Sequence, residues 1–212
     1  MLFKELQKKD FVVYDNLILK NYQNTISNTL LDPYFPWYLI NSRSDDLNNF
    51  YSTKKTTSTQ KNVLEYVKFV HEFYRENSHK TSSVSTHSKI VDQLIQQILE
   101  NLNLNSLEIL RAKSNLQTSN VNVDNKNIST PHIDTKNKHI VGIYYVNNSD
   151  GDTTIFKNKK ILTKIQPKKG RLLFFKGDLK HSAGYPIKNQ IRVVINMNFK
   201  IDQQLKHGKR SL

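Results

Sequence analysis

Hydrophobic residues recur with two different periods along the chain, and the change falls near residue 107. In the segment 89–102 (KIVDQLIQQILENL) they lie three or four positions apart, which places them on one face of a helix. Farther along, apolar and polar residues alternate, as they do in strands with one buried face. Segments with this alternation are separated by turn sequences and span 107–116, 139–148, 153–158, 161–165, 171–177 and 191–201. Short strands at this spacing predict a mostly β fold, either a sandwich or a jelly roll.

The chain before residue 89 has a more mixed pattern. The apolar run Phe11–Tyr14 predicts a short strand. Asp15 is expected to cap a helix over residues 17–31, which a following Asp-Pro pair ends. The aromatic segment 33–42 holds two prolines, so we expect it to be extended or turning, with its rings packed on the core.

Two further segments complete the N-terminal part. Residues 42–61 are rich in Ser, Thr, Lys and Asn and predict a loop, whereas 65–77 (EYVKFVHEFYREN) fits a strand or a helix. We therefore expect residues 1–106 to form a helical and extended region on the outside of a β core of residues 107–212. The two parts are expected to act as one functional unit.

Composition narrows the class of protein. Hydrophobic residues make up 37% of the 212 residues, which is enough for a folded core. No apolar run approaches the roughly 20 residues of a membrane span, and charges interrupt the N-terminus where a signal peptide would be apolar. A soluble, intracellular protein of the cytoplasm is therefore expected. There is no cysteine, so a metal would have to bind His, Asp, Glu or backbone oxygen atoms.

The chain is strongly basic. Thirty-two Lys and Arg against 18 Asp and Glu give a formal net charge of +14. Such a surplus is typical of proteins with anionic partners, such as nucleic acid or an acidic peptide. The lysines are scattered, however, and those near the candidate site described next, Lys136, Lys138 and Lys180, also fit an ordinary solvated rim. The sequence leaves both interpretations open and does not indicate an oligomeric state.

A candidate metal site combines His132, Asp134 and His181. On an extended segment, residues two apart point to the same side, so His132 and Asp134 project together. His181 follows the strand expected over 171–177, and a jelly roll can bring such distant strands together. Two His and one carboxylate on one face of a metal are typical of non-haem Fe(II) oxygenases. His-x-Asp alone would equally fit a solvated loop.

Arg192 adds a second chemical feature. It stands 11 residues after His181 within the apolar strand IRVVINMNF. A guanidinium is costly to bury without an anionic partner, and its planar fork suits a carboxylate. A strand-edge arginine that faces water is the alternative. If Arg192 is buried, it predicts a site for a carboxylate-bearing ligand.

With these motifs in order, the chain resembles the 2-oxoglutarate/Fe(II)-dependent oxygenases of the prolyl-hydroxylase-like branch. The resemblance covers about residues 107–200 and runs through His132–Asp134, Ile143–Asn147, Asp150–Phe156, Pro167–Phe175, His181 and Arg192. A narrower likeness at Phe35–Leu39, His71–Tyr74 and Arg111–Leu116 is similar to small oxygenases of phage and marine bacterial genomes.

This resemblance implies a double-stranded β-helix, the jelly roll of that family, and a set of roles. His132, Asp134 and His181 would be the catalytic metal ligands for Fe(II). Arg192 would bind the far carboxylate of 2-oxoglutarate, with Tyr145 offering its phenol to the same group and Asn115 approaching the near carboxylate. The cofactors implied are Fe(II), 2-oxoglutarate as co-substrate and O2, with succinate and CO2 released.

The expected reaction is hydroxylation of a C–H bond in a peptide, a protein or a small amino-acid-like substrate. Asp134 favours this over halogenation, because the halogenases of the superfamily lack that carboxylate. A nucleic-acid-modifying member is the first alternative, although Arg192 is not followed by the second arginine of the demethylases. A non-catalytic jelly-roll binding protein is the other. The segment 117–130 is expected to border the active-site mouth, and 42–61 to form a second lid.

Overall fold

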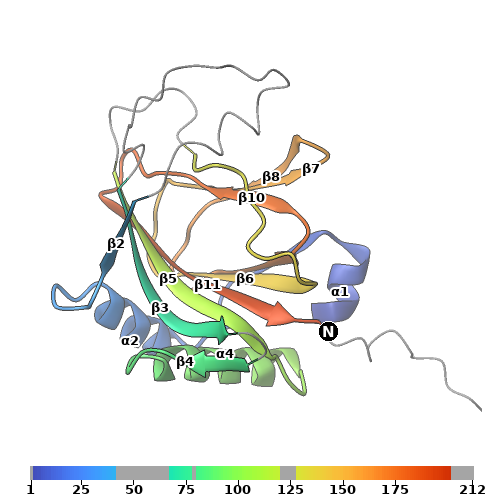
Figure 1. Ribbon diagram of the computed structural model, residues 1–212, viewed down its shortest axis with the longest axis horizontal. Coiled ribbons are helices and arrows are strands. Elements are labelled where there is room, and N and C mark those ends of the chain that lie inside the picture. Colours follow the sequence, from blue (N-terminus) through green and yellow to red (C-terminus); the bar gives the residue numbers. More distant parts are fainter. Residues whose placement is uncertain (1, 42–66, 78–79, 120–127, 202–212) are drawn as a thin grey trace, which may run out of the picture.

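Two antiparallel sheets face each other in the computed structural model, which describes residues 2–41, 67–77, 80–119 and 128–201 (Figure 1). The large sheet has the strand order β1-β9-β6-β11-β5-β3-β2, with β4 paired to β3. Its strands are β1 (Phe11–Tyr14), β2 (Tyr38–Asn41), β3 (Val67–Asn77), β4 (Lys80–Ser83), β5 (Ile109–Thr118), β6 (His139–Tyr145), β9 (Leu172–Lys176) and β11 (Ile191–Lys200). The small sheet consists of β10 (Lys180–Ala183), β7 (Thr153–Lys157) and β8 (Lys160–Ile165) in that order.

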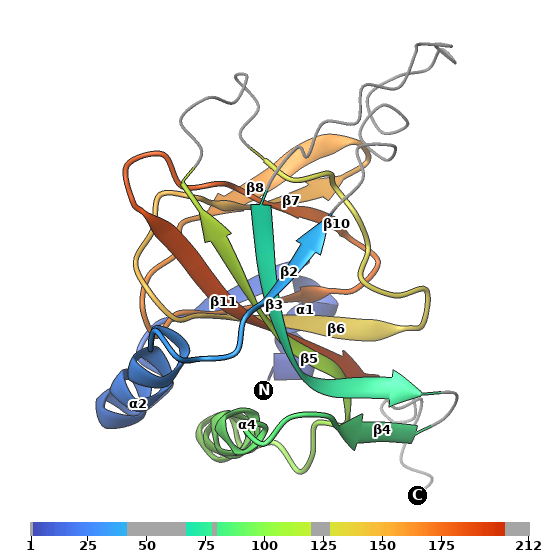
Figure 2. The ribbon, with the colours of Figure 1, turned by 60° about the vertical axis from the view of Figure 1, so that its left-hand side comes forward.

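Three helices accompany the sheets in the described residues. They are α1 (Leu2–Lys8), α2 (Lys20–Leu30) and α4 (Lys89–Leu102). Helices α2 and α4 lie on the side of the large sheet that faces away from the small sheet (Figures 1 and 2). No helix among the described residues is long and apolar enough to cross a membrane.

The large sheet has two apolar faces because side chains alternate along each strand. One face packs against the helices. Its buried core joins residues of the three helices to every second residue of β11, namely Val193, Ile195, Met197 and Phe199. The other face packs against the small sheet through a second cluster that includes Val141, Ile143, Leu173 and Phe175. The mostly β, jelly-roll prediction is confirmed.

Residues 67–77 of the ambiguous segment form β3, which pairs with β5 and β2, while residues 65 and 66 lie outside the described part of the chain. Strand residues with alternating β-branched and aromatic side chains pack well on a pleated surface, and Phe73 is fully buried against the helices. Strands from the first 106 residues thus belong to the large sheet. The helix over 89–102 is confirmed by α4. The loop predicted for 42–61 lies outside the described residues.

Other N-terminal details differ from the prediction. Asp15 does not cap α2, because its carboxylate accepts two hydrogen bonds from Arg171, and the helix begins at Lys20. Among the aromatic residues after Pro33, Phe35 is buried but Tyr34 is 93% exposed. The prediction that these rings all pack on the core was therefore wrong in part. Helix α1 and strands β4 and β10 were not predicted.

Candidate metal and co-substrate site

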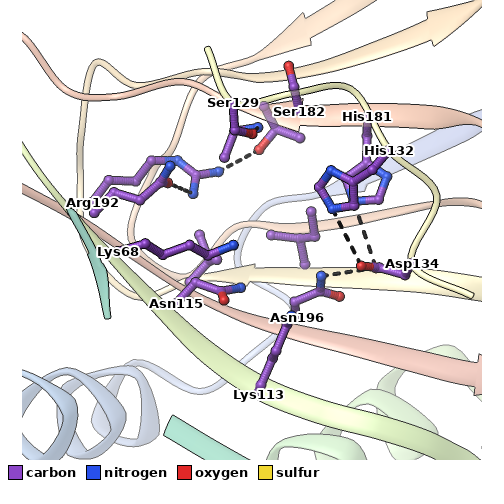
Figure 3. Close-up of a pocket in the computed structure, with 15 residues that line it drawn as sticks. Lys68, Lys113, Asn115, Ser129, His132, Asp134, His181, Ser182, Arg192 and Asn196 are labelled. Carbon is purple, nitrogen blue, oxygen red and sulfur yellow. Dashed lines mark hydrogen bonds and ion pairs between the residues drawn. The ribbon is translucent and has the colours of Figure 1, made fainter. Parts of the chain in front are cut away.

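One pocket opens between the two sheets, and its two ends differ in chemistry (Figure 3). The two histidines and Asp134 lie at one end, and Arg192 lies at the other. The side chains that line the pocket come from β3, β5, β6, β7, β10, β11 and the segment before β6: Lys68, Lys113, Asn115, Gln117, Ser129, His132, Asp134, Ile143, Thr153, His181, Ser182, Ala183, Arg192, Val194 and Asn196.

Backbone pairing places the two histidines opposite each other. His132 and His181 form an isolated antiparallel bridge, with N–H···O distances of 3.0 and 2.9 Å between their backbones. Residues opposed in this way project their side chains to the same face, and the two imidazole centroids are 4.7 Å apart. The bridge explains how ligands so distant in sequence meet.

Asp134 completes the cluster. Its Oδ1 lies 3.7 Å from His132 Nε2 and its Oδ2 lies 3.7 Å from His181 Nε2. Arg111 donates to Oδ1 at 2.9 Å, and Asn196 donates to Oδ2 at 3.0 Å. Burial by itself would raise the pKa of Asp134, but the two imidazoles and Arg111 outweigh it and hold that pKa well below its usual value. The carboxylate is therefore ionised and fixed in orientation.

Both histidines can present a ring nitrogen to a metal. Burial is the main cause that lowers the pKa of His181 to about 4, so the ring is uncharged at neutral pH. His132 Nδ1 lies 2.9 Å from the Thr130 carbonyl oxygen, which accepts a hydrogen bond from the Nδ1–H group and leaves Nε2 as the ligand atom. The donor atoms of His132, Asp134 and His181 all lie within 4.8 Å of one another.

This donor set fits a divalent non-haem iron. Two imidazoles and one carboxylate without any cysteine are the ligands that such a centre uses, and they leave positions for exchangeable ligands. The hydrogen bonds that Arg111 and Asn196 give to Asp134 are the kind of outer support that orients metal-bound carboxylates.

Arg192 is buried, with 1% of its surface exposed. Its Nε donates to the Gly151 carbonyl at 2.7 Å, its Nη1 to Gln117 Oε1 at 2.8 Å and its Nη2 to Thr153 Oγ1 at 2.7 Å. All of these acceptors are neutral, and burial lowers the pKa of Arg192. The strand-edge alternative is therefore excluded, and the guanidinium lines the pocket without a hydrogen bond to any carboxylate of the described residues, although Asp152 is near enough to raise its pKa.

The two remaining predicted residues take different places. Asn115 lines the pocket, and its buried Oδ1 has no hydrogen-bond partner. Tyr145 is fully buried, does not line the pocket, and donates its hydroxyl to Thr153 Oγ1 at 2.8 Å. Its ring lies 5.9 Å from the Arg192 guanidinium carbon. Tyr145 thus contacts Thr153 and Arg192 without itself lining the pocket.

The turn Asp150-Gly151-Asp152 has a function in shaping the Arg192 end. The Asp150 carboxylate accepts backbone N–H groups of residues 187–189, and the Gly151 carbonyl accepts from Arg192. A Cβ at Gly151 would lie 2.5 Å from the Gly184 carbonyl oxygen and 3.1 Å from Arg192 Cδ. Glycine is therefore needed where these backbones and the guanidinium approach one another.

Several site residues were not predicted. Thr153 and Gln117 hold Arg192, Arg111 and Asn196 hold Asp134, and Lys68 and Lys113 line the pocket. A signal exists for β5, in which Arg111, Lys113, Asn115 and Gln117 occupy every second position between apolar or small residues. Such alternation of polar side chains in a strand with a buried opposite face indicates a polar cavity. The part of 117–130 between residues 120 and 127 lies outside the described residues.

Comparisons with known proteins address the fold. No protein-family model matches the chain, and no curated protein matches its sequence with significance. Solved structures do match. A 2OG-Fe(II) oxygenase family protein from Burkholderia pseudomallei has a TM-score of 0.66 at 11% identity, over 93% of this chain and 88% of that chain.

Two further structures extend the comparison. A prolyl hydroxylase from Trichoplax adhaerens, solved with a hypoxia inducible factor peptide fragment, has a TM-score of 0.61 at 12% identity and covers 99% of this chain and 92% of its own. The non-haem α-ketoglutarate-dependent epimerase SnoN of nogalamycin biosynthesis has a TM-score of 0.60 at 10% identity, with 93% and 82% covered. The chain therefore has the fold of the 2OG-Fe(II) oxygenases, prolyl hydroxylases among them, as its motifs predicted. The narrower likeness to phage and marine bacterial proteins stays a prediction.

Proposed function

We propose that this protein is an Fe(II)- and 2-oxoglutarate-dependent oxygenase that hydroxylates a C–H bond of its substrate. The observation that carries the proposal is the pairing of two features in one pocket. A His-Asp-His cluster suited to iron lies at one end, and a buried arginine with only neutral partners lies at the other. In the proposed site a dicarboxylate binds the metal through one end and Arg192 through the other, since both groups line the same pocket.

The residues have distinct roles in this proposal. His132, Asp134 and His181 hold the iron, and Arg192 binds the far carboxylate of 2-oxoglutarate. Thr153 can offer its hydroxyl to the same carboxylate. When bound, the iron and its co-substrate supply the oxidising chemistry, in which O2 and 2-oxoglutarate yield succinate, CO2 and an oxygen atom for the substrate.

The other polar residues position these groups. Arg111 and Asn196 fix the Asp134 carboxylate, while Tyr145 and Gln117 fix Thr153 and the Arg192 guanidinium. Asn115, whose Oδ1 is unpartnered, is proposed to meet the near end of the co-substrate through its amide. The apolar cluster around Val141, Ile143 and Val194 keeps water away from the inner side of the pocket.

Neighbours of the same fold are associated with different classes of molecule, since one was solved with a peptide fragment and another is an epimerase of nogalamycin biosynthesis. For this chain we propose a peptide, protein or small amino-acid-like substrate, as the sequence suggested. The proposal treats residues 1–106 and 107–212 as one functional unit, because β3 of the first part contributes Lys68 to the pocket.

The direct test is formation of succinate from 2-oxoglutarate by the full chain with Fe(II) and O2. We expect slow succinate formation without substrate, and none with the His132→Ala variant. Asp178→Ala removes an exposed carboxylate in the turn before β10 and is the matched control, expected to behave as the unaltered chain. Wild-type succinate formation by His132→Ala would refute the assignment of the metal site.

A further inference from the structure

Polar side chains form rows across three neighbouring strands on the pocket face. In one row, Lys68 of β3 is paired with Gln117 of β5, which is paired with Arg192 of β11. Four residues along the same strands, Lys113 of β5 is paired with Asn196 of β11. Because residues opposed in antiparallel strands project to the same face, both lysines point toward the same space as Arg192 and the metal ligands.

Lys68 and Lys113 are basic side chains without a hydrogen-bond or ion-pair partner in the described residues. Both line the pocket and are only partly exposed, and neither makes a hydrogen bond or an ion pair with the part of the chain that the structure describes. Figure 3 shows Lys68 reaching between the Arg192 end and the metal end. Burial lowers the pKa of Lys68, and it lowers the pKa of Lys113 to about 8. Keeping two ammonium groups here costs stability unless a bound group compensates.

The nearby carboxylates are already engaged. Asp134, the one carboxylate among the lining residues, is held by Arg111 and Asn196. Glu72 lies opposite Lys113 on β3, but its carboxylate binds Arg75. Asp134 raises the pKa of both lysines and Glu72 raises that of Lys113, but burial outweighs them, so the two acids do not compensate the lysines.

Binding of iron and 2-oxoglutarate would not neutralise the basic side chains of the pocket. A divalent metal and a dicarboxylate cancel each other's formal charge, and Arg111 offsets Asp134. Lys68, Lys113 and Arg192 then leave the occupied pocket with a surplus of positive charge. Inside a partly dry cavity such a surplus favours an anionic ligand much more strongly than it would on the surface.

We propose that Lys68 and Lys113 bind an anionic group of the substrate, a carboxylate or a phosphate, beside the metal. The inference rests on the proposed oxygenase function and names the substrate class of that site. The reaction is unchanged, since the anion only anchors the molecule whose C–H bond is hydroxylated. An acidic or phosphorylated amino acid, free or within a peptide, has this chemistry, whereas a peptide that is neutral near the reacting carbon lacks it.

The test uses the full chain loaded with Mn(II) and N-oxalylglycine, an oxygen-inert analogue of 2-oxoglutarate. The rise in melting temperature on loading reports on the metal and co-substrate site. Sulfate, glutamate against glutamine, and O-phosphoserine against serine, each amino acid as its N-acetyl amide so that only the side chain can carry charge, are then titrated at constant ionic strength. We expect sulfate and the anionic member of at least one pair to raise the melting temperature further, and the neutral members to have no effect.

Variants assign the response to the two lysines. Lys68→Met and Lys113→Met are each expected to weaken anion binding about tenfold, and the double variant about a hundredfold, as for the loss of charge-assisted hydrogen bonds. Lys164→Met removes an exposed lysine of β8 and should leave binding unchanged. Glutamate and O-phosphoserine distinguish a carboxylate site from a phosphate site, and either result supports the proposal.

Three outcomes would overturn it. One is the lack of response to every anion, the second is equal binding of the neutral probes, and the third is an anion response that survives in the double variant. A Lys68→Met protein that needs more N-oxalylglycine but keeps its anion response would assign that lysine to the co-substrate instead. Repeating the titration without Mn(II) and N-oxalylglycine separates the hypotheses. Failure of loading alone counts against the oxygenase function, and failure of the lysine-dependent step alone counts against this inference.

Discussion

The two faces of β5 lie a few ångströms apart and have opposite physical character. On the helix side, Leu110 and Ala112 are 6% and 0% exposed and continue the packed core. On the pocket side, Arg111, Lys113 and Asn115 project toward the metal site. The same strand therefore serves both as part of a close-packed layer and as the wall of a charged cavity.

The difference shows what each face contributes. Burial of apolar area stabilises folding, so the helix face needs no ligand to account for its composition. Charged groups in a partly dry cavity oppose folding unless they are paired, so the pocket face is explained by what it binds. Substitutions on the helix face should lower stability and leave ligand affinity unchanged. Substitutions on the pocket face should lower ligand affinity without lowering stability.

The largest expected effect is loss of metal binding in Asp134→Ala. The variant removes the one charged ligand of the cluster, so we expect 2-oxoglutarate turnover to be abolished. Mn(II) affinity should fall by about a thousandfold or more, because loss of a direct ligand costs more than the roughly 10–100-fold typical of residues that only hydrogen-bond to a ligand. Mn(II) binding is measured by electron paramagnetic resonance. Retention of Mn(II) affinity would show that the cluster is not the metal site.

The opposite face is tested by Ile98→Ala. Ile98 of α4 is fully buried against the large sheet, and removing such a side chain typically costs about 2–5 kcal/mol of stability. Ile161→Ala is the matched control, since Ile161 is 56% exposed on β8, and its loss should change stability by less than about 0.5 kcal/mol. Chemical denaturation gives both values. A change in Mn(II) affinity for Ile98→Ala would mean that the two faces are coupled.

The sequence predicted the features that depend on local periodicity. Alternation marked the strands from residue 107 on, and the helical period marked 89–102, because burial of one face imposes these periods directly. The spacing of His132 and Asp134 predicted that they project together. Arg192 within an apolar strand indicated a buried cation, and its burial bears this out.

Features that depend on pairing between distant strands could not be predicted. The ambiguous segment 65–77 gave no register, so Lys68 could not be placed opposite Gln117. Asp15 has the chemistry of a helix cap, but the distant Arg171 takes its carboxylate. Thr153 looks like an ordinary strand residue until folding brings Arg192 to its hydroxyl. In each case a contact between residues far apart in sequence decides the role.

Arg192→Met should have an intermediate effect on the pocket face. Hydrogen bonds to charged groups contribute about 1.5–3 kcal/mol, so the requirement for 2-oxoglutarate should rise about 10- to 150-fold. Mn(II) affinity measured without co-substrate should stay the same, because the three metal ligands lie at the other end of the pocket. An unchanged 2-oxoglutarate requirement in succinate formation would rule out Arg192 as the carboxylate partner.

The smallest expected effect is the pH dependence of anion binding at Lys113. Arg111, Lys68, Asp134 and Glu72 surround this lysine, and burial is the main cause that lowers its pKa to about 8 from 10.5. The folded chain releases this proton at a lower pH than the unfolded chain does. Between about pH 8 and 10.5 the unfolded chain therefore carries more protons, and the stability of the folded chain rises with pH. An anion favours the protonated form, so sulfate affinity should fall a few-fold as the pH rises through about 8.

Sulfate keeps its charge over this range, so a change in affinity reports on the protein. Titrations of the chain loaded with Mn(II) and N-oxalylglycine between about pH 7 and 9 measure the effect. Lys113→Arg keeps the charge at high pH and should abolish the fall, because a guanidinium holds its proton far above this range. Lys113→Met should bind weakly with little pH dependence. A fall that persists unchanged in Lys113→Arg would assign the titration to another group and remove Lys113 from the anion site.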